Sequence, residues 1–396
     1  MVDVFRLSDS QLAEIARAFR DQVGSGLAAD GRQIRCLPTW CATELSQTPE
    51  PTLVLDLGGT NLRAAKMERT DAGWRVAGDL AQARLPVTRG TPLSRSDFLA
   101  IQADLLARVA EGARDLPLGY CFSYPAESLP SGDARLIRWT KEVFVPDTEG
   151  RCVGEPLLEA LHDRSIPCSS VTVVNDTVAS LLAGAPAAPG ESLIGLIVGT
   201  GTNMAALMPA ALIPKLGRET LPFLPVNLES GNFHPPFLTR WDDELDRASE
   251  QPGTQRFEKA VSGAYLGRLL KSACPAASID PEAGSQAVVA VATGTVPAPA
   301  DISDAARSLL LRSARLVAAT LAGLASLLPA SAACCRIVAE GSLFWKAPNY
   351  HADVKSALDS TLAALGRPEL QCRIVTIPDA NLAGAALGAQ PRPATR

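Results

Sequence analysis

The sequence predicts an α/β fold with two lobes, and three observations support this prediction. A chain of 396 residues is too long for one ordinary hydrophobic core, because single cores stop growing at about 250–300 residues. Short apolar runs typical of buried strands alternate with longer segments of helical periodicity. Finally, an apolar strand, a glycine turn and a second strand occur together twice, roughly 140 residues apart, which favours duplicated lobes that face one another.

The expected elements follow this alternation from the N-terminus. An amphipathic lead-in helix spans residues 9–23 and precedes a proline-containing loop. In the first half, strands are expected at 52–57, 62–69, 73–80, 117–123 and 169–176, and helices at 95–114 and 177–185. In the second half, strands are expected within 192–207 and at 335–341 and 371–377, and helices at 256–273, 303–328, 350–365 and the C-terminal tail. The Ala-Pro-rich stretch at 185–190 marks the expected boundary.

The composition excludes several classes of protein. With 47% hydrophobic and 20% charged residues, the chain is neither disordered nor fibrous. The chain has 37 basic and 42 acidic residues and contains no block of basic residues, so no nucleic-acid partner is expected. Nine scattered cysteines lack C-x-x-C spacing and the three histidines are isolated, which argues against a transition-metal site. Free thiols and a start without the apolar core of a signal peptide favour the cytoplasm.

Two uncharged runs, 192–214 and 316–335, are long enough to be tested as membrane spans. The first contains two prolines and the turn GTGTN, and the second is interrupted at Pro329. A buried strand pair and a packed helix explain them better than lipid does, so no membrane partner is expected.

The first glycine turn places a carboxylate beside permissive backbone. Asp56 ends an apolar strand, and Gly58 and Gly59 allow backbone N–H groups to approach an anion closely. Thr60 and Asn61 add side-chain donors. Phosphate is the natural guest, with Asp56 placed to hold Mg²⁺ through water. The alternative is an ordinary glycine hairpin. The absence of G-x-x-x-x-G-K-[ST] excludes a P-loop NTPase.

The second glycine turn is of the same type and comprises Gly199, Thr200 and Gly201, followed by Thr202 and Asn203. One such loop is often only a tight turn. Two of them, each between apolar strands, could clamp a polyphosphate from both sides. The pair therefore favours phosphate binding.

Asn175 and Asp176 lie where a strand ends and a helix begins. Asp176 is either a helix N-cap or a general base that takes a proton from a substrate hydroxyl. Phosphoryl transfer needs little beyond such a base, a metal and donors to the phosphates. Thr140 and Lys141 would add a hydroxyl and a mobile cation, although a lone lysine is more commonly a solvated surface residue.

Polar residues inside apolar segments suit a sugar, because each sugar hydroxyl both donates and accepts hydrogen bonds. Asn227, Glu229 and Glu258 are such residues. Glu258 could instead be a surface acid of its helix that pairs near Lys259.

Taken together, several segments resemble the motifs of the hexokinase family. They occur in that family's order over roughly residues 50–345, and they read LDLGGTNLRAA, FSYP, WTK, VVNDTVASLLAG, IGLIVGTGTN, VNLESGNF, PGTQRFEKAVSGAYLGRLL and AEGSLF. The tail DANLAGAALGA is a weaker match to the family's closing helix. Single motifs are shared with the wider actin-like and sugar-kinase superfamily, but the combination is more selective.

The resemblance implies two actin-like ATPase (ribonuclease H-like) lobes around a central cleft. It divides the chain into a lead-in at 1–50, a small lobe at 51–188 and a large lobe at 189–396, with the last helix as a candidate to return to the small lobe. The implied activity is that of an ATP-dependent hexokinase that phosphorylates the 6-hydroxyl of glucose or a related hexose, the entry step of glycolysis, with Mg²⁺. A monomer and a homodimer are equally compatible.

The resemblance also assigns site residues. The sugar pocket would comprise Ser123, Thr140, Lys141, Asn175, Asp176, Asn203, Glu229 and Glu258. Asp176 would be the base on the 6-hydroxyl, with Lys141 as a second catalytic residue. The first phosphate loop would comprise Asp56, Gly58, Gly59, Thr60, Asn61 and Arg63, and the second Gly199, Thr200 and Gly201. The residues bordering the adenosine would be Ser262, Gly263, Gly341 and Ser342.

Two segments depart from the family pattern. Where the family has a Trp after the pocket Glu and then Gly-Ala-Phe-Gly, this chain has Ser230 followed by GNFH. The acidic-glycine signature before the last helix is replaced by residues 379–383. These departures leave open a hexokinase-like sugar sensor with little turnover, and a sugar-independent actin-like ATPase is a third hypothesis. The preferred hexose and phosphoryl donor also stay open.

Overall fold

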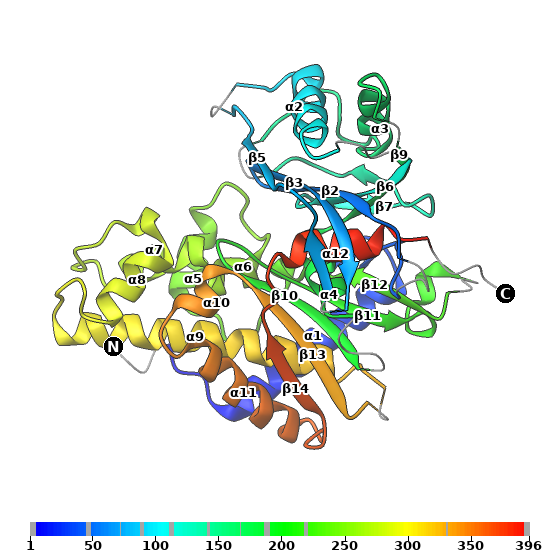
Figure 1. Ribbon diagram of the computed structural model, residues 1–396. Helices are drawn as coiled ribbons and strands as arrows, with labels where there is room; N and C mark the ends of the chain where they lie inside the picture. The colour runs from blue at the N-terminus through cyan, green and yellow to red at the C-terminus, as the bar shows by residue number, and fades with distance from the viewer. Residues whose placement is uncertain are drawn as a thin grey trace.

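The computed structural model has two lobes, each built on one β-sheet (Figure 1). It describes residues 5–44, 49–71, 73–87, 91–110, 115–140, 143–166, 168–185, 191–217, 221–329 and 332–391. The lobes are layered from strands and helices, which confirms the predicted α/β fold. The lobe boundary expected at 188–189 lies outside the described residues, and the other domain limits stay predictions.

The small lobe contains a mixed sheet of order β4-β3-β2-β6-β9, with β5 also paired to β3. Its strands are β2 (Thr52–Gly58), β3 (Asn61–Thr70), β4 (Gly73–Val76), β5 (Ala81–Arg84), β6 (Leu116–Phe122) and β9 (Cys168–Val174). The central strand β2 is buried from Thr52 to Leu57, which explains its continuous apolar run. Helices α2 (Arg95–Ala107) and α3 (Glu155–His162) pack on this sheet, and the ribbon of β7 (Ala126–Ser128) and β8 (Ala134–Leu136) lies beside it.

The large lobe contains a sheet of order β1-β12-β11-β10-β13-β14. Its strands are β1 (Leu37–Pro38), β10 (Ser192–Val198), β11 (Thr202–Pro209), β12 (Phe223–Asn227), β13 (Cys334–Glu340) and β14 (Gln371–Val375). Helices α1 (Asp9–Ala28), α9 (Ala300–Ala325) and α11 (Tyr350–Ala364) pack on one another and share one hydrophobic core with this sheet. The lead-in helix is therefore part of the large lobe.

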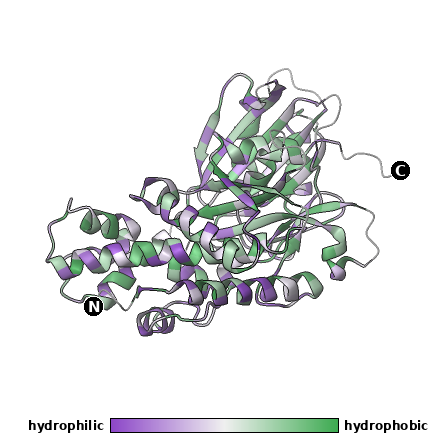
Figure 2. Ribbon diagram, turned by 90° about the horizontal axis from the view of Figure 1, so that it is seen from below, coloured by the Kyte–Doolittle hydropathy of each residue, from purple (hydrophilic) through white to green (hydrophobic). Residues whose placement is uncertain are grey.

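The remaining helices of the large lobe are short. They are α5 (Arg240–Arg247), α6 (Arg256–Val261), α7 (Gly263–Ala273), α8 (Ser285–Ala292) and α10 (Ser342–Lys346). The 3₁₀ turns are η3 (Ala210–Leu212), η4 (Pro214–Leu216), η5 (Ser230–Asn232) and η6 (Pro281–Ala283). Figure 2 shows hydrophilic and hydrophobic residues alternating along the peripheral helices, as expected for helices with one face in solvent.

Two helices pack against each other between the sheets. Helix α4 (Asp176–Ala183) follows β9 of the small lobe but contacts β10 and β11, whereas α12 (Ala380–Gly388) follows β14 of the large lobe but contacts β2 and β6 (Figure 1). A Cβ atom on Gly384 would lie 1.8 Å from the carbonyl oxygen of Ala179, so the close α4–α12 contact requires glycine. The last helix thus packs on strands of the small-lobe sheet.

Several boundaries differ from the sequence prediction. The helix expected at 95–114 ends at Ala107, the strand expected at 73–80 ends at Val76, and the strand expected at 371–377 ends at Val375. The helix expected at 256–273 is two helices, because Ser262 adopts extended backbone between α6 and α7. The short strands β1, β5, β7, β8 and β12 were not predicted.

The uncharged run at 192–214 contains β10 and β11, and the run at 316–335 begins in α9. By length and composition α9 could cross a membrane, but 83% of its most apolar window is buried inside the protein. Core packing therefore explains the apolar character of this helix.

Candidate active site

The first glycine turn is a tight hairpin between β2 and β3. Gly58 pairs with Asn61, so Gly59 and Thr60 form the turn, and Gly59 has a φ of 73°, which favours glycine. The Tyr124 hydroxyl donates to the Gly59 carbonyl oxygen at 2.7 Å and fixes the turn to the end of β6. The alternative of a glycine hairpin, expected from the sequence, therefore describes the backbone correctly. Gly58 and Asn61 are exposed in this hairpin.

Asp56 is buried at 4% exposure next to this turn. Its Oδ2 accepts hydrogen bonds from Arg63 Nε at 3.0 Å and Nη2 at 2.7 Å. Its Oδ1 is buried and has no hydrogen-bond partner among the described residues. Asp56 therefore keeps one acceptor for a cation or a water.

Arg63 connects this turn to the start of the last helix. Its Nη1 donates to Asp379 Oδ1 at 2.9 Å, and Asp379 has a φ of 51°. Burial lowers the pKa of Arg63, but the Asp56 and Asp379 carboxylates outweigh it, so the pKa is raised. Glu340 lies at the end of β13. Burial raises its pKa to about 6, the positive charge of Arg63 opposes this shift, and the negative charge of Asp379 adds to it. Sequence reasoning did not assign a role to Asp379 or Glu340.

The second glycine turn meets both segments expected to border the adenosine. Gly263 N–H donates to the Gly199 carbonyl oxygen at 2.7 Å, and Ala264 N–H donates to that of Thr200 at 3.1 Å. Gly341 has a φ of 113°, and a Cβ atom there would lie 2.2 Å from the Val198 carbonyl oxygen. The structure therefore brings together the residues Gly199, Thr200, Gly201, Ser262, Gly263, Gly341 and Ser342.

Asn175, and not Asp176, is the N-cap of α4. The Asn175 side chain accepts a hydrogen bond from Thr177 N–H at 2.9 Å, and Asp176 Oδ1 accepts from the same N–H at 2.8 Å. Asp176 begins α4, which follows β9 of the small lobe and packs on β10 and β11 of the large lobe. Asp176 therefore lies at the junction of the two lobes.

A chain of amides leads to Glu229. Asn203 Nδ2 donates to Asn227 Oδ1 at 2.7 Å, and Asn227 Nδ2 donates to Glu229 Oε1 at 2.9 Å. Glu229 has a φ of 57°, and Ser230 N–H donates to Asn203 Oδ1 at 3.1 Å. Burial raises the pKa of Glu229, while Asn227, Arg35 and Arg138 oppose this shift and Asp176 adds to it. The side chains present carbonyl and carboxylate oxygens, which suit sugar hydroxyls.

Glu258 faces the second glycine turn. Its Oε2 accepts a hydrogen bond from Thr202 N–H at 2.9 Å, and a Cβ atom on Gly201 would lie 2.6 Å from the same oxygen. Lys259 is buried and pairs with Asp246 at 2.6 Å instead. The alternative of a surface acid paired near Lys259 is therefore wrong.

The remaining predicted sugar residues belong to the small lobe. Ser123 is buried, and its N–H donates to the Leu57 carbonyl oxygen at 3.1 Å, beside the first turn. Thr140 follows Trp139, whose ring packs edge-on against that of Tyr124, with 4.8 Å between the ring centroids. Lys141 lies outside the described residues, so its role stays a prediction.

A segment near the N-terminus also joins the lobes at the base of the site. Strand β1 pairs with β12, and Trp40 N–H donates to Ser128 Oγ of the small lobe at 3.0 Å. A small cavity lies between this segment, β9 and β12, and its lining includes Thr39, Asn175 and Asn227. A strand of two residues is too short to have a periodic pattern, so it could not be predicted.

Comparison with known proteins agrees with this geometry. Two family models, both described as hexokinase, match residues 1–186 and residues 193–278 with 287–390. Human hexokinase-3 is 34% identical over 279 residues, covering 67% of this chain and 30% of that protein. Hexokinase-1 of Saccharomyces cerevisiae is 32% identical over 287 residues, covering 68% of this chain and 59% of that protein. The chain thus matches less than two thirds of the length of either relative.

Solved structures share the fold over nearly the whole chain. A hexokinase from Schistosoma mansoni complexed with glucose has a TM-score of 0.81 at 24% identity, covering 98% of this chain and 97% of that one. A second hexokinase crystal structure has a TM-score of 0.78 at 23% identity, covering 98% and 96%. The chain has the actin-like ATPase fold and belongs to the hexokinase family of sugar kinases.

Proposed function

We propose that this protein is an ATP-dependent hexokinase that phosphorylates the 6-hydroxyl of glucose or a related hexose, the entry step of glycolysis, with Asp176 as the general base. The observation that carries the proposal is the position of Asp176. This residue begins α4, which follows β9 of the small lobe and packs on β10 and β11 of the large lobe, and the preceding Asn175 lines one cavity together with Asn227. A base there would lie between a sugar site and a phosphate site.

The reaction needs one proton transfer and one displacement. Asp176 would take the proton of the 6-hydroxyl as its oxygen attacks the terminal phosphorus of ATP, and the bond to the ADP oxygen would break. Asn203, Asn227 and Glu229 would orient the other sugar hydroxyls. This division of labour agrees with catalysis by positioning and electrostatics.

The phosphates would bind between the glycine turns. The exposure of Gly58 and Thr200 supports this assignment, as does the positive charge of Arg63 beside the first turn. Ser262, Gly263, Gly341 and Ser342 would border the adenosine, because they gather at the second turn.

Mg²⁺ fits the first turn as a companion of the nucleotide. Within the described ranges, no group of three or more His, Cys, Asp or Glu side chains could hold a metal ion by itself. Asp56 offers one buried oxygen without an N–H or O–H donor, and Mg²⁺ is commonly held by one or two carboxylates together with substrate phosphates. When bound, the ion would neutralise charge on the phosphates, and Asp56 would hold it through water.

The direct test is ADP release by the purified protein with Mg-ATP, with and without a panel of hexoses. We expect sugar-dependent ADP release with stoichiometric hexose 6-phosphate. Sugar-independent ADP release would instead indicate a general ATPase. A sugar-induced change in tryptophan fluorescence without turnover would indicate a sensor. Because Ser230 replaces the family's Trp beside Glu229, glucose, mannose and fructose are all included in the panel.

A cytoplasmic location, as expected from the cysteines and the N-terminal sequence, forms part of this proposal. It is tested by fractionating cells that express the tagged chain and assaying each fraction for the protein. Recovery in the membrane fraction would contradict it.

A further inference from the structure

A hydrogen bond crosses between the lobes on the sugar side. Arg138, which follows β8 in the small lobe, donates from Nη1 to Gln251 Oε1 at 3.2 Å. Gln251 lies between α5 and α6 of the large lobe. Neither residue belongs to the motifs that suggested the activity, although Arg138 directly precedes Trp139 and Thr140.

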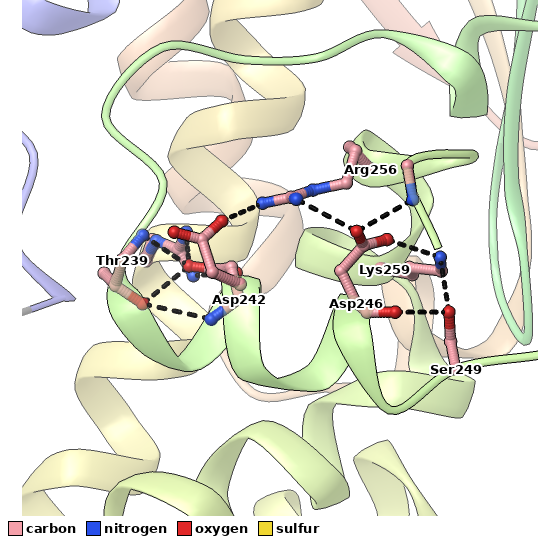
Figure 3. A network of polar contacts seen from close by, with 9 residues as sticks. Thr239, Asp242, Asp246, Ser249, Arg256 and Lys259 are labelled. Atoms are coloured by element: carbon pink, nitrogen blue, oxygen red, sulfur yellow. Dashed lines mark hydrogen bonds and ion pairs between the residues drawn. The ribbon is translucent and has the colours of Figure 1, made fainter. Parts of the chain in front are cut away.

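The loop that carries Gln251 is held by a buried ionic network (Figure 3). Lys259 Nζ donates to the Gln251 carbonyl oxygen at 2.8 Å. It also donates to Asp246 Oδ1 at 2.6 Å, a contact drawn in Figure 3. Asp246 Oδ2 accepts from Gly253 N–H at 2.8 Å and from Arg256 at 3.1 Å. Lys259, Asp246 and Arg256 are all buried, so the backbone at Gln251 is fixed relative to α6, which also carries Glu258.

The other end of the contact is fixed as well. Trp139 N–H donates to Glu149 Oε1 at 2.8 Å, and its indole Nε1 donates to Thr148 Oγ1 at 2.8 Å. The Trp139 ring is buried among Phe98, Phe122 and Tyr124. The backbone next to Arg138 is therefore anchored in the core of the small lobe.

Arg138 also adds positive charge to the site. Burial raises the pKa of Glu229, and Asn227, Arg35 and Arg138 oppose that shift. The Nε of Arg138 is buried and has no hydrogen-bond partner among the described residues. The guanidinium thus contacts Gln251 through Nη1, while Nε stays without a partner among the residues that the structure describes.

We propose that Arg138 is a positioning residue that holds the lobes together on the sugar side by binding Gln251 of the large lobe. This inference rests on the proposed hexokinase activity. Both ends of the contact are anchored, so lobe separation must break it.

We expect substitution of Arg138 to change the KM for hexose and not the KM for the nucleotide. A charged hydrogen bond at a rim is weak, so Arg138→Gln should raise the KM for hexose about 5- to 10-fold, equivalent to about 1–1.4 kcal/mol. The KM for ATP should stay within about 2-fold, because the phosphate turns are held by other contacts. Arg138→Lys keeps the charge and should recover part of the loss.

A double-mutant cycle tests the contact itself. Steady-state kinetics are measured for R138Q, Q251A and R138Q/Q251A, with Arg135→Gln as the matched control, since Arg135 on β8 forms an exposed pair with Glu127. The double variant should have a hexose KM close to that of R138Q, because Q251A removes a contact already lost. Fully additive effects, an unchanged hexose KM in R138Q, or an equal rise in the KM for ATP would each overturn the proposal.

The wild-type protein separates this test from the test of function. If it phosphorylates none of the hexoses, the proposed function fails, and the same cycle is run on hexose affinity measured by tryptophan fluorescence. Thermal melting of every variant checks folding. A hexose Kd that does not differ between wild type and R138Q would then overturn the role of Arg138.

Discussion

Arg63 Nη1 and Asp379 Oδ1, separated by 316 positions in the sequence, form an ion pair of 2.9 Å that joins the first glycine turn to the start of α12. Asp379 belongs to the segment that departs from the family's signature. The altered segment therefore still places a carboxylate, that of Asp379, in contact with Arg63 beside the first glycine turn. We expect Asp379→Ala to raise the KM for ATP about 2- to 5-fold without changing that for hexose, since a half-exposed pair is worth up to about 1 kcal/mol. Initial rates at varied ATP measure this effect.

The control for that variant is Asp359→Ala. Asp359 pairs with Lys355 on the surface of α11, away from both glycine turns. It should leave both KM values unchanged. A change in the KM for hexose alone in D379A would contradict the assignment of Arg63 to the phosphate site.

Glu340 should make stability fall as pH rises. Burial raises its pKa from 4.5 to about 6, so between these values the folded protein holds more protons than the unfolded chain. Stability contributed by the neutral carboxyl is complete below about pH 4.5 and is lost as pH rises through about 6. Glu340→Gln removes this loss and should stabilise the protein at pH 7.5, by on the order of 1 kcal/mol after discounting for partial exposure.

Urea denaturation at pH 5 and pH 7.5 measures that difference. The gain of E340Q over wild type should be larger at pH 7.5 than at pH 5. An equal gain at both pH values would show that the substitution acts through packing and not through ionisation.

Gly341 should tolerate no side chain. At a φ of 113°, a Cβ atom would lie 2.2 Å from the Val198 carbonyl oxygen and 2.7 Å from the Gly199 nitrogen, both backbone atoms that cannot rotate away. We expect Gly341→Ala to cost about 3 kcal/mol or more of unfolding free energy. Gly294→Ala is the matched control, because Gly294 also has a positive φ of 77° but no atom within 4 Å. Its cost should stay near 1 kcal/mol, about that of the strained φ. Similar losses in both variants would refute the clash.

The buried pair of Arg312 and Asp242 should dominate the stability of the large lobe. Both side chains are at most 3% exposed, and Arg312 Nη2 donates to Asp242 Oδ2 at 2.8 Å. Arg312→Met would leave the buried Asp242 carboxylate without its ion-pair partner and should lower the free energy of unfolding by about 3–5 kcal/mol. On the same helix, Arg315 pairs with the exposed Asp9, so Arg315→Met should cost about 1 kcal/mol or less. Urea unfolding of the two variants compares them directly, and equal costs would contradict this ranking.

Local patterns predicted the parts of the site that lie on regular elements. The β2–β3 and β10–β11 hairpins combine apolar runs with glycine turns, so their positions could be predicted within about two residues. The break at Ser262 could not, because it comes from a distant contact: Gly263 N–H binds the Gly199 carbonyl oxygen. The same holds for Asp379 and Gln251, whose partners are Arg63 and Arg138 on other elements. Such residues carry no periodic signal and are assigned by tertiary contacts alone.

Asp176 itself gives the sharpest test of the mechanism. Asn175 fills the N-cap, so Asp176→Asn should leave α4 and the fold intact while it removes the base. We expect kcat to fall by about 10²-fold or more, with hexose binding still measurable by fluorescence. Asp163→Asn, an exposed acid after α3, is the control and should keep normal rates. A near-normal kcat in D176N would mean that another group takes the proton, and a loss of hexose binding would mean that Asp176 acts mainly as a ligand.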